Sequence, residues 1–286
     1  MPDQSQPTAP ESSATEPSAT GPSAAGAHAA PGSVAARLAV VRDRIAAAAV
    51  AAGRDPAEVR LLVATKTQTP EAVLEALAAG VDLIGENRVQ ELVAKAPAVA
   101  DRVAAGALEV HMIGHLQRNK INQVLGTTTG LETLDSLELA QAVSDRCVRD
   151  GRTGDHALDV MVQVNVTGEE SKYGVRPDDA VPLAIAVAAL PGLRLTGFMT
   201  IGARLPEPAA GGTAEDGSAE DTVRAGFARL RAVRDEVRAS GAPGTSTATN
   251  LSMGMTGDLE LAIAEGATIV RVGTAVFGPR VTATTL

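Results

Sequence analysis

The sequence predicts a single (β/α)8 barrel, a TIM barrel, preceded by a disordered tail. Strand and helix signals alternate from residue 33 to the end of the chain, and eight strand signals can be distinguished. Strict alternation predicts a parallel sheet, because parallel strands need a crossover connection. About 230 residues remain when two low-complexity segments are set aside, and this length suits one barrel. An open doubly wound sheet is the alternative architecture.

The first 32 residues are not expected to join the core. They contain eight Ala, six Pro and five Ser, and no Leu, Ile, Val or aromatic residue. Such a segment cannot bury enough apolar surface to offset the entropy lost on ordering, so we expect residues 1–32 to be disordered. They carry neither the basic start nor the apolar stretch of a secretory signal. Residues 204–222 have a similar composition and are expected to form a loop inserted into the barrel domain, 33–286.

The first elements of the barrel carry clear boundary signals. An amphipathic helix is expected over 33–52, with Ser33 as its N-cap and a glycine after its end. The apolar run 60–65 is typical of a buried strand. Thr69 then opens a helix over 69–80, because it is followed by a first-turn proline and a carboxylate, both favourable at that end.

The later elements repeat this pattern of apolar runs and amphipathic segments. The remaining strands are expected over 81–85, 108–114, 131–134, 157–166, 193–200, 248–253 and 269–276. The remaining helices are expected over 87–100, 119–125, 137–149, 178–189, 223–240 and 259–266.

Composition excludes several classes of protein. The net charge is −9, but 1–32 and 204–222 hold eight acidic residues and one basic, which leaves 26 acidic against 24 basic elsewhere. The charge therefore indicates nothing about partners. The single cysteine, Cys147, excludes an intramolecular disulfide and favours a reducing compartment. Without a run of eighteen apolar residues no membrane span is expected, and the lack of Trp argues against stacking on nucleic acid. We predict a cytoplasmic protein that contacts neither membranes nor nucleic acid.

Lys66 is the first candidate for chemistry. The chain has only four lysines beside 21 arginines, and Lys66 directly follows the apolar strand 60–65. In a (β/α)8 barrel the active site lies at the carboxyl ends of the strands. Arg cannot form an imine, whereas a lysine amine that loses its proton can attack a carbonyl group to give a Schiff base. The alternative is an ordinary surface lysine just past a strand.

Polar and glycine-rich segments after the last two strands indicate a phosphate site. Barrels commonly bind phosphate there. The candidate residues are Ser252, Gly254, Thr256, Gly257, Arg271, Gly273 and Thr274. The alternative is that these glycines only make turns. A phosphate site together with an imine-forming lysine indicates a phosphorylated aldehyde, of which pyridoxal 5′-phosphate (PLP) is the common one.

Other chemistry is weakly indicated. His111 and His115 are four residues apart but lack an HExxH context, so no metal site is expected. Glu86 and Asp135 are the obvious acid–base residues if Lys66 acted in catalysis without a cofactor. Cys147 is expected to be a small buried hydrophobic residue.

With these motifs in place, the chain resembles the pyridoxal phosphate homeostasis protein family from about residue 33 to 280. The matching runs are LLVATKTQTPEAV around Lys66, IGENRVQEL (84–92), HMIGHLQRNK (111–120), LETLDS (131–136), VNVTGEESKYGV (164–175), GFMTI (197–201), LSMGMTGDLELAI (251–263) and RVGTAVFG (271–278). One departure is Val110, where relatives often have Trp before the histidine. The tail and the 204–222 insertion look particular to this chain.

The resemblance implies an alanine-racemase-type N-terminal barrel that holds PLP as an imine on Lys66. It implies that Arg271 lies near the pyridine nitrogen and that Ser252, Gly273 and Thr274 contact the phosphate. It also implies that Asn87 lies in the pocket. The residues so assigned are Lys66, Asn87, Ser252, Arg271, Gly273 and Thr274. The family is thought to buffer and deliver the cofactor, with no firmly established reaction, so no catalytic residue is assigned.

Three functions compete at this point. The first is a cofactor carrier, expected to be a monomer that transiently meets apo forms of PLP-dependent enzymes. The second is a PLP-dependent amino-acid racemase or decarboxylase, but a racemase needs a second base opposite Lys66, and the only tyrosine, Tyr173, lies in a glycine-bearing loop. The third is a Schiff-base aldolase that uses Lys66 without a cofactor.

Overall fold

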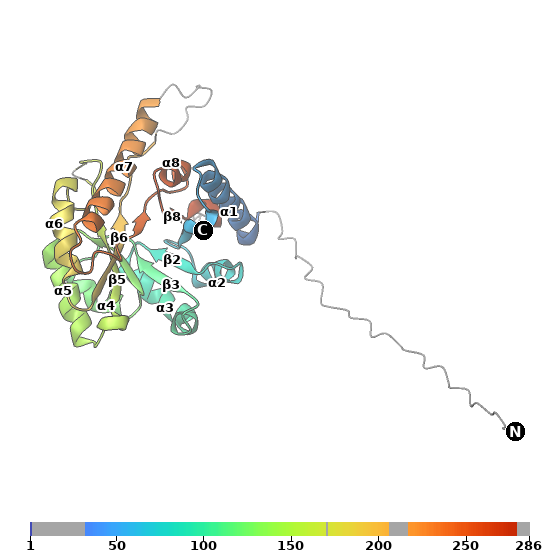
Figure 1. Ribbon diagram of the computed structural model, residues 1–286. Coiled ribbons are helices and arrows are strands. Elements are labelled where there is room, and N and C mark those ends of the chain that lie inside the picture. The colour runs from blue at the N-terminus through green and yellow to red at the C-terminus, as the bar shows by residue number, and fades with distance from the viewer. Residues whose placement is uncertain (2–31, 170, 206–216, 279–286) are drawn as a thin grey trace, which may run out of the picture.

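The computed structural model describes residues 1, 32–169, 171–205 and 217–278. Within these residues, eight parallel strands close into a barrel in the order β1 to β8, with helices around the outside (Figure 1). The predicted (β/α)8 fold is therefore confirmed, and the open sheet is excluded. Most of the expected tail (2–31) and of the expected insertion (206–216) lie outside the described residues.

The strands lie inside the expected ranges or extend one residue beyond them. They are β1 (Arg60–Ala64), β2 (Leu83–Glu86), β3 (Glu109–Met112), β4 (Gly130–Leu134), β5 (Leu158–Gln163), β6 (Leu193–Met199), β7 (Asn250–Ser252) and β8 (Ile269–Val272). Each pairs in parallel with the next, and β8 closes the barrel by pairing with β1, where Val272 lies opposite Val63.

The helices follow the expected alternation. They are α1 (Val34–Ala51), α2 (Pro70–Ala78), α3 (Val89–Ala104), α4 (Ile121–Leu125), α5 (Leu137–Arg149), α6 (Pro177–Ala188), α7 (Gly217–Ala239), α8 (Leu259–Ala264) and α9 (Thr274–Phe277). The predicted caps form: the Ser33 hydroxyl accepts a bond from the Ala36 N–H at 3.2 Å, and Thr69 does the same for Ala72 at 3.3 Å.

Three boundary predictions are wrong by four residues or more, and one of them is the end of α3, which lies at Ala104 rather than 100. The loop expected over 204–222 gives way to α7 from Gly217 onward. Glu220 and Asp221 in its first turns favour helix formation, because carboxylates interact well with the positive end of the helix dipole. The strand expected over 269–276 ends at Val272, since Gly273 leaves the extended conformation and α9 begins at Thr274.

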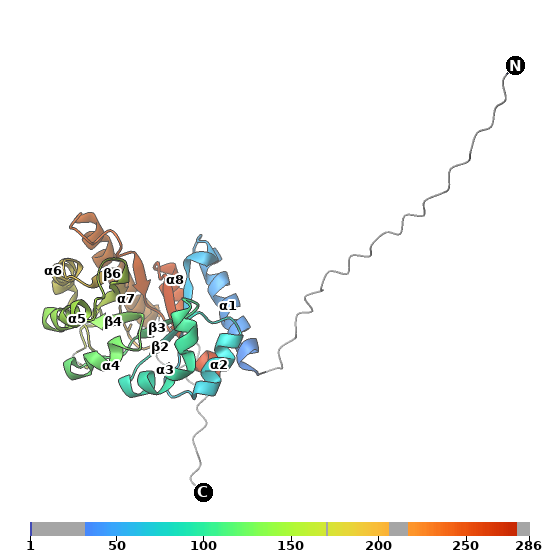
Figure 2. The same ribbon diagram turned by 90° about the horizontal axis from the view of Figure 1, so that it is seen from below.

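The N-terminal helix α1 completes the ring of helices. It packs against α2 on one side and against α8 and α9 on the other. Arg37 donates through Nε to the Val276 carbonyl at 2.6 Å, and Arg44 pairs with Glu260 at 2.8 Å. Figures 1 and 2 both show α1 beside the red C-terminal elements. Elements from opposite ends of the chain therefore share one interface.

Two separate apolar clusters stabilise the barrel. The larger one contains residues from helices and strands and fills the space between the two layers. The smaller one contains residues from strands and strand ends alone, so we place it inside the barrel. Its members are Leu62, Ala64, Leu83, Ile113, Met161, Met199 and Ile269. In the described part of the chain, no helix has the length and apolar character needed to cross a membrane.

Candidate functional site

Lys66 lies at the carboxyl end of the barrel, two residues beyond β1. Leu62 and Ala64 face the barrel interior, and the side-chain alternation of a strand places Lys66 next on that side. The Lys66 side chain is exposed, and among the described residues no hydrogen bond or ion pair occupies its amine. The amine is therefore accessible to a ligand at the mouth of the barrel.

The backbone immediately after Lys66 is strained. Thr67 has a φ of 64°, and it is the one non-glycine residue with a positive φ among those that the structure describes. A β-branched residue rarely adopts this conformation, which costs on the order of 1 kcal/mol or more. The Thr67 N–H donates to Glu91 Oε2 at 2.5 Å, and Gln68 N–H donates to the Thr65 carbonyl at 3.0 Å. These bonds hold the strained turn in place.

A buried ion pair lies beneath this turn. Lys95 of α3 places its Nζ 2.5 Å from Glu86 Oε1 and donates to the Thr65 carbonyl at 2.7 Å. Thr65 donates its hydroxyl to the same Glu86 oxygen at 2.5 Å. Glu91 Oε2, which accepts from Thr67, lies 3.4 Å from Lys95. Both residues that flank Lys66 are thus fixed to one cluster, the buried cluster, which consists of the buried Thr65, Glu86 and Lys95 and the half-buried Glu91.

The segment after β8 lies next to Lys66 in the barrel. A Cβ on Gly273 would stand 3.0 Å from the Ala64 carbonyl oxygen, so the glycine allows the ends of β8 and β1 to approach closely. Gly273 is half-buried and Thr274 is exposed. Both predicted residues are therefore placed beside the strand end that carries Lys66.

The loop after β7 contacts the outer helices. Gly254 is buried against α8, where a Cβ would meet the Ala262 Cβ at 2.5 Å. The Thr256 carbonyl accepts a bond from Arg44 of α1 at 3.0 Å, which ties this part of the loop to the outer layer. Gly254 and the Thr256 carbonyl are therefore already held by α8 and α1.

Ser252 and Arg271 are brought together inside the barrel. Arg271 donates through Nη1 to Ser252 Oγ at 2.9 Å and through Nη2 to the Thr200 carbonyl at 2.7 Å. Ser252 in turn donates its hydroxyl to Glu132 Oε2 at 2.6 Å. All three side chains are buried, and burial lowers the pKa of Arg271 while the charge of Glu132 opposes that effect.

His111 extends this network toward the amino end of the barrel. Its Nδ1 lies 2.7 Å from Glu132 Oε1 and its Nε2 lies 3.5 Å from Glu109 Oε2. Burial alone lowers the pKa of His111, but the bonds and charges of Glu109 and Glu132 outweigh burial and raise it to about 9. Burial raises the pKa of Glu132, yet His111 and Arg271 bring it below its usual value.

Asn87 follows β2, on the other side of Lys66. Its backbone carbonyl passes so close to Gly114 that a Cβ there would stand 1.9 Å from the oxygen. The buried amide oxygen of Asn87 has no hydrogen-bond partner in the described part of the chain. Since a buried amide group without a partner is costly, this side chain is suited to bind a ligand.

The rim of the mouth carries an aromatic stack. The rings of His115 and Tyr173 lie 3.9 Å apart at an angle of 11°. His115 Nδ1 lies 3.5 Å from Asp135 Oδ2, and burial raises the pKa of Asp135. Tyr173 itself is 57 % exposed.

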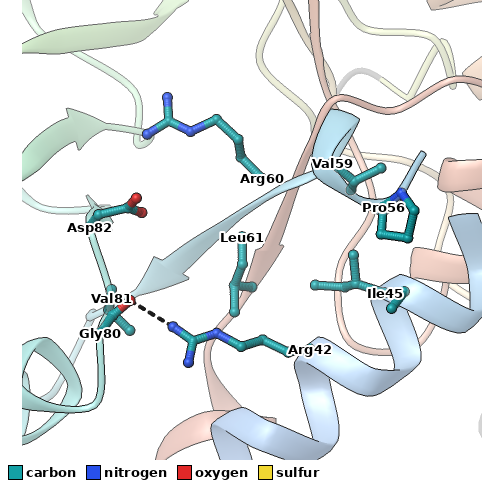
Figure 3. Close-up of a pocket in the computed structure, with 10 residues that line it drawn as sticks. Arg42, Ile45, Pro56, Val59, Arg60, Leu61, Gly80, Val81 and Asp82 are labelled. Atoms are coloured by element: carbon teal, nitrogen blue, oxygen red, sulfur yellow. Dashed lines mark hydrogen bonds between the residues drawn. The ribbon is translucent and has the colours of Figure 1, made fainter. Parts of the chain in front are cut away.

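A pocket of about 290 Å³ opens at the other end of the barrel, beside the start of β1. Figure 3 shows it between α1 and the segment 80–82, with Arg42 bonded to the Gly80 carbonyl. Arg60, at the first position of β1, also lines this pocket and pairs with Glu109 at 2.8 Å. Lys66 lies past the opposite end of the same strand, so this pocket is separate from the candidate site.

The sequence patterns did not indicate a role for Lys95 or Glu132, and His111 was weighed only as a metal ligand. Two signals pointed to them. Lys95 is one of four lysines in a chain that otherwise uses arginine, and Glu132 is a charge within an expected buried strand. A group of three or more metal-ligating side chains is absent from the described residues.

Comparison with known proteins identifies the class of barrel. Residues 38–281 match the family described as alanine racemase, N-terminal domain, which defines the class of barrel. A Pseudomonas aeruginosa protein named pyridoxal phosphate homeostasis protein is 43 % identical over 248 residues, which cover 87 % of this chain and 96 % of the relative. The chain belongs to the pyridoxal phosphate homeostasis protein family, which confirms the resemblance found in the sequence.

Two solved structures are similar over most of their length. An unknown protein from Bifidobacterium adolescentis is 44 % identical, with a TM-score of 0.77 and coverage of 85 % of this chain and 94 % of the other. PipY of Synechococcus elongatus, solved with PLP bound, is 31 % identical, with a TM-score of 0.67 and coverage of 86 % and 100 %.

Proposed function

We propose that this protein binds PLP as a Schiff base on Lys66, and that it stores and delivers the cofactor rather than turning over a substrate. One observation carries the proposal: the Lys66 amine is exposed at the barrel mouth, on a strained turn that the buried cluster beneath it holds in place. When bound, the cofactor supplies an aldehyde that condenses reversibly with an amine and releases one water molecule.

The neighbouring residues fit this group. We assign the phosphate to Gly273 and Thr274, at the end of the barrel where β8 finishes, and we assign Ser252, whose proton is donated to Glu132, to the support of Arg271 rather than to the phosphate. Arg271, whose two Nη atoms are already fixed, is assigned to the pyridine-nitrogen side of the ring. The unpartnered amide of Asn87 is assigned to the polar substituents of the ring.

The position of Tyr173 favours a carrier over a racemase. A racemase needs a second acid–base group on the opposite face of the imine. The only tyrosine is stacked on His115 at the rim, with more than half of its side chain in solvent. This arrangement provides no buried, oriented hydroxyl group for proton transfer at the ligand.

The cofactor-free aldolase is disfavoured by the surroundings of its two nominated acid–base residues. Glu86 is buried and its Oε1 is bound by both Lys95 and Thr65. Asp135 lies at the rim beside His115 rather than on a strand next to β1. Glu86 is thus held beside its counter-ion beneath the turn and Asp135 lies away from β1, so neither is well placed as a base for the Lys66 amine.

We further propose a cytoplasmic monomer whose transient partners are the apo forms of PLP-dependent enzymes. The single cysteine favours a reducing compartment. A reversible imine suits delivery, because a second amine can displace Lys66 and remove the cofactor without any other chemistry. The delivery step can be checked by mixing the loaded protein with an apoenzyme and following the recovery of that enzyme's activity.

The central test is covalent labelling of Lys66. Wild-type protein incubated with PLP should show a visible absorption band that borohydride bleaches, and peptide mapping should find the reduced pyridoxyl group on Lys66. Lys66→Ala should lose the covalent label and keep weak binding through the phosphate-binding residues. Lys120→Ala, which removes another of the four lysines, is the matched control and should label normally.

Two results would contradict the proposal. Unchanged labelling of Lys66→Ala would show that another amine holds the cofactor. A wild-type protein that stays colourless after incubation with PLP would remove the cofactor itself and favour the aldolase.

A further inference from the structure

A continuous line of charged and polar side chains crosses the interior of the barrel. It runs from Arg271 through Ser252, Glu132 and His111 to Glu109, which pairs with Arg60 at the amino end. The successive atom–atom distances are 2.9, 2.6, 2.7, 3.5 and 2.8 Å. The network joins the candidate cofactor site to the pocket of Figure 3 through groups contributed by five different strands.

The inner part of this line is fully enclosed. The side chains of Glu132 and His111 are 1 % and 7 % exposed. Gly130 creates the space for the imidazole, because a Cβ at that position would stand 2.6 Å from the ring. Burying ionised groups is costly unless every charge is paired. We therefore expect each charge in this line either to have a partner of opposite sign or to serve the function of the protein.

The bonds of Glu132 determine the orientation of Ser252. The hydroxyl has one proton, which it donates to Glu132 Oε2, and it accepts a bond from Arg271 Nη1. The other carboxylate oxygen of Glu132 is held by His111. A change at Glu132 therefore alters the hydrogen-bonding direction of Ser252 and the position of the Arg271 guanidinium.

We propose that Glu132 and His111 are positioning residues for the cofactor site: Glu132 fixes the Ser252 hydroxyl so that its oxygen holds Arg271 Nη1 in place, and neither residue contacts the bound group. This inference rests on the proposed function and deepens it, because it assigns a role to two buried residues that the ligand does not reach. The carboxylate supplies the acceptor for Ser252, and the imidazole holds the carboxylate in place.

The charges along the line alternate in sign. The groups that face His111 are Glu109 on its own strand and Glu132 on β4, and beyond these lie Arg271 on β8 and Arg60 on β1. With its pKa raised to about 9, His111 is protonated at neutral pH and balances the carboxylate of Glu132. Each inner charge then has a neighbour of opposite sign.

The substitution Glu132→Gln tests the role directly. The new amide keeps one acceptor oxygen in place of two, so it can no longer accept from both Ser252 and His111, and the geometry that holds Arg271 through Ser252 is disturbed. We expect the Kd for PLP, measured by absorbance titration, to rise about tenfold, which corresponds to one charge-assisted hydrogen bond. The wavelength of the bound-cofactor band should shift as well.

His111→Gln is the second variant, because it keeps an N–H donor for Glu132 and is less disruptive to folding. Its Kd for PLP should rise less than that of Glu132→Gln. We expect the wild-type band to shift as His111 loses its proton around pH 9, and this shift should be absent from His111→Gln. Asp159→Asn is the matched control. Asp159 pairs with Arg194 at 2.5 Å outside this line, so its loss should leave PLP binding unchanged.

Thermal unfolding with and without PLP separates positioning from a purely structural role. If Glu132 and His111 only stabilise the barrel, both variants unfold at lower temperature by equal amounts with and without PLP, and Kd and band match the wild type. That result overturns the inference. Failure of the wild type to bind PLP on Lys66 would instead refute the proposed function, so the two failures are distinguishable.

Discussion

The buried ion pair beneath the Lys66 turn gives a sharp stability prediction. Lys95→Met keeps the length and apolar stem of the side chain but removes the Nζ that contacts Glu86 and the Thr65 carbonyl. The Glu86 carboxylate would keep the Thr65 hydroxyl as a donor, while its Oε2 already lacks a partner in the described part of the chain. The substitution thus leaves a buried charge without its counter-ion.

The expected loss is large for a single substitution. Removal of one partner from a buried ion pair costs about 3–5 kcal/mol of the free energy of unfolding. The side chains of Lys95 and Glu86 are 7 % and 1 % exposed, so solvent screens the pair little. The double variant Lys95→Met/Glu86→Gln removes both charges and should recover most of the loss, to within about 1–2 kcal/mol of the wild type.

Urea unfolding followed by far-UV circular dichroism is the suitable assay, because the chain has no Trp to report by fluorescence. Lys172→Met is the control, since Lys172 pairs with Glu169 near the surface and should contribute much less to stability. If Lys95→Met loses less than about 1 kcal/mol, or if the double variant is no more stable than the single one, the pair does not act as described.

Two further predictions concern stability. The pKa of His111 is raised from 6.5 to about 9. Its contribution to the free energy of unfolding, about 3 kcal/mol, should therefore be complete below pH 6.5 and lost as the pH rises through 9. Urea titrations of the wild type and His111→Gln from pH 6 to 10 check this, and parallel plots of stability against pH would contradict it. Gly114→Ala places a Cβ 1.9 Å from the Asn87 carbonyl oxygen and should cost about 2 kcal/mol, whereas Gly257→Ala, with nothing within 4 Å, should be neutral; equal thermal midpoints for the two would refute the crowding argument.

The barrel and the position of Lys66 could be predicted because they depend on local patterns. Apolar runs separated by amphipathic segments indicate strands that need crossovers, and the carboxyl end of each strand is then known from the chain direction alone. Lys66, Asn87 and Gly273 all follow directly after strands, so the same rule placed them at one end of the molecule.

The internal polar network could not be predicted in the same way. Strands that are covered on both faces read as continuous apolar runs, so the sequence gives little indication of which residues point inward. His111 and Glu132 are 21 residues apart and meet only because β3 pairs with β4 in one register, with His111 opposite Gly130. Register is a property of the closed barrel rather than of any short motif.

Two of the boundaries that were wrong have a related cause. The α7 helix begins in a segment of small and acidic residues whose composition is that of a loop, and its apolar face starts at Val223. At the other end, Gly273 separates β8 from α9, but the apolar residues Ala275 and Val276 continue the pattern of the strand. Composition and hydropathy alone do not show where the chain passes from loop to helix or from strand to helix.

The contact of α1 with α8 and α9 also has a consequence for the order in which the protein folds. During synthesis, α1 leaves the ribosome first, whereas its partner Val276 is added 239 residues after Arg37. Until then the apolar face of α1 (Val34, Leu38, Val41, Ile45 and Ala49) lacks most of its native cover. The ring of helices can therefore close only after synthesis of the last strand, so a nascent chain should depend on chaperones, and a permutant that joins α1 directly behind α9 should fold sooner.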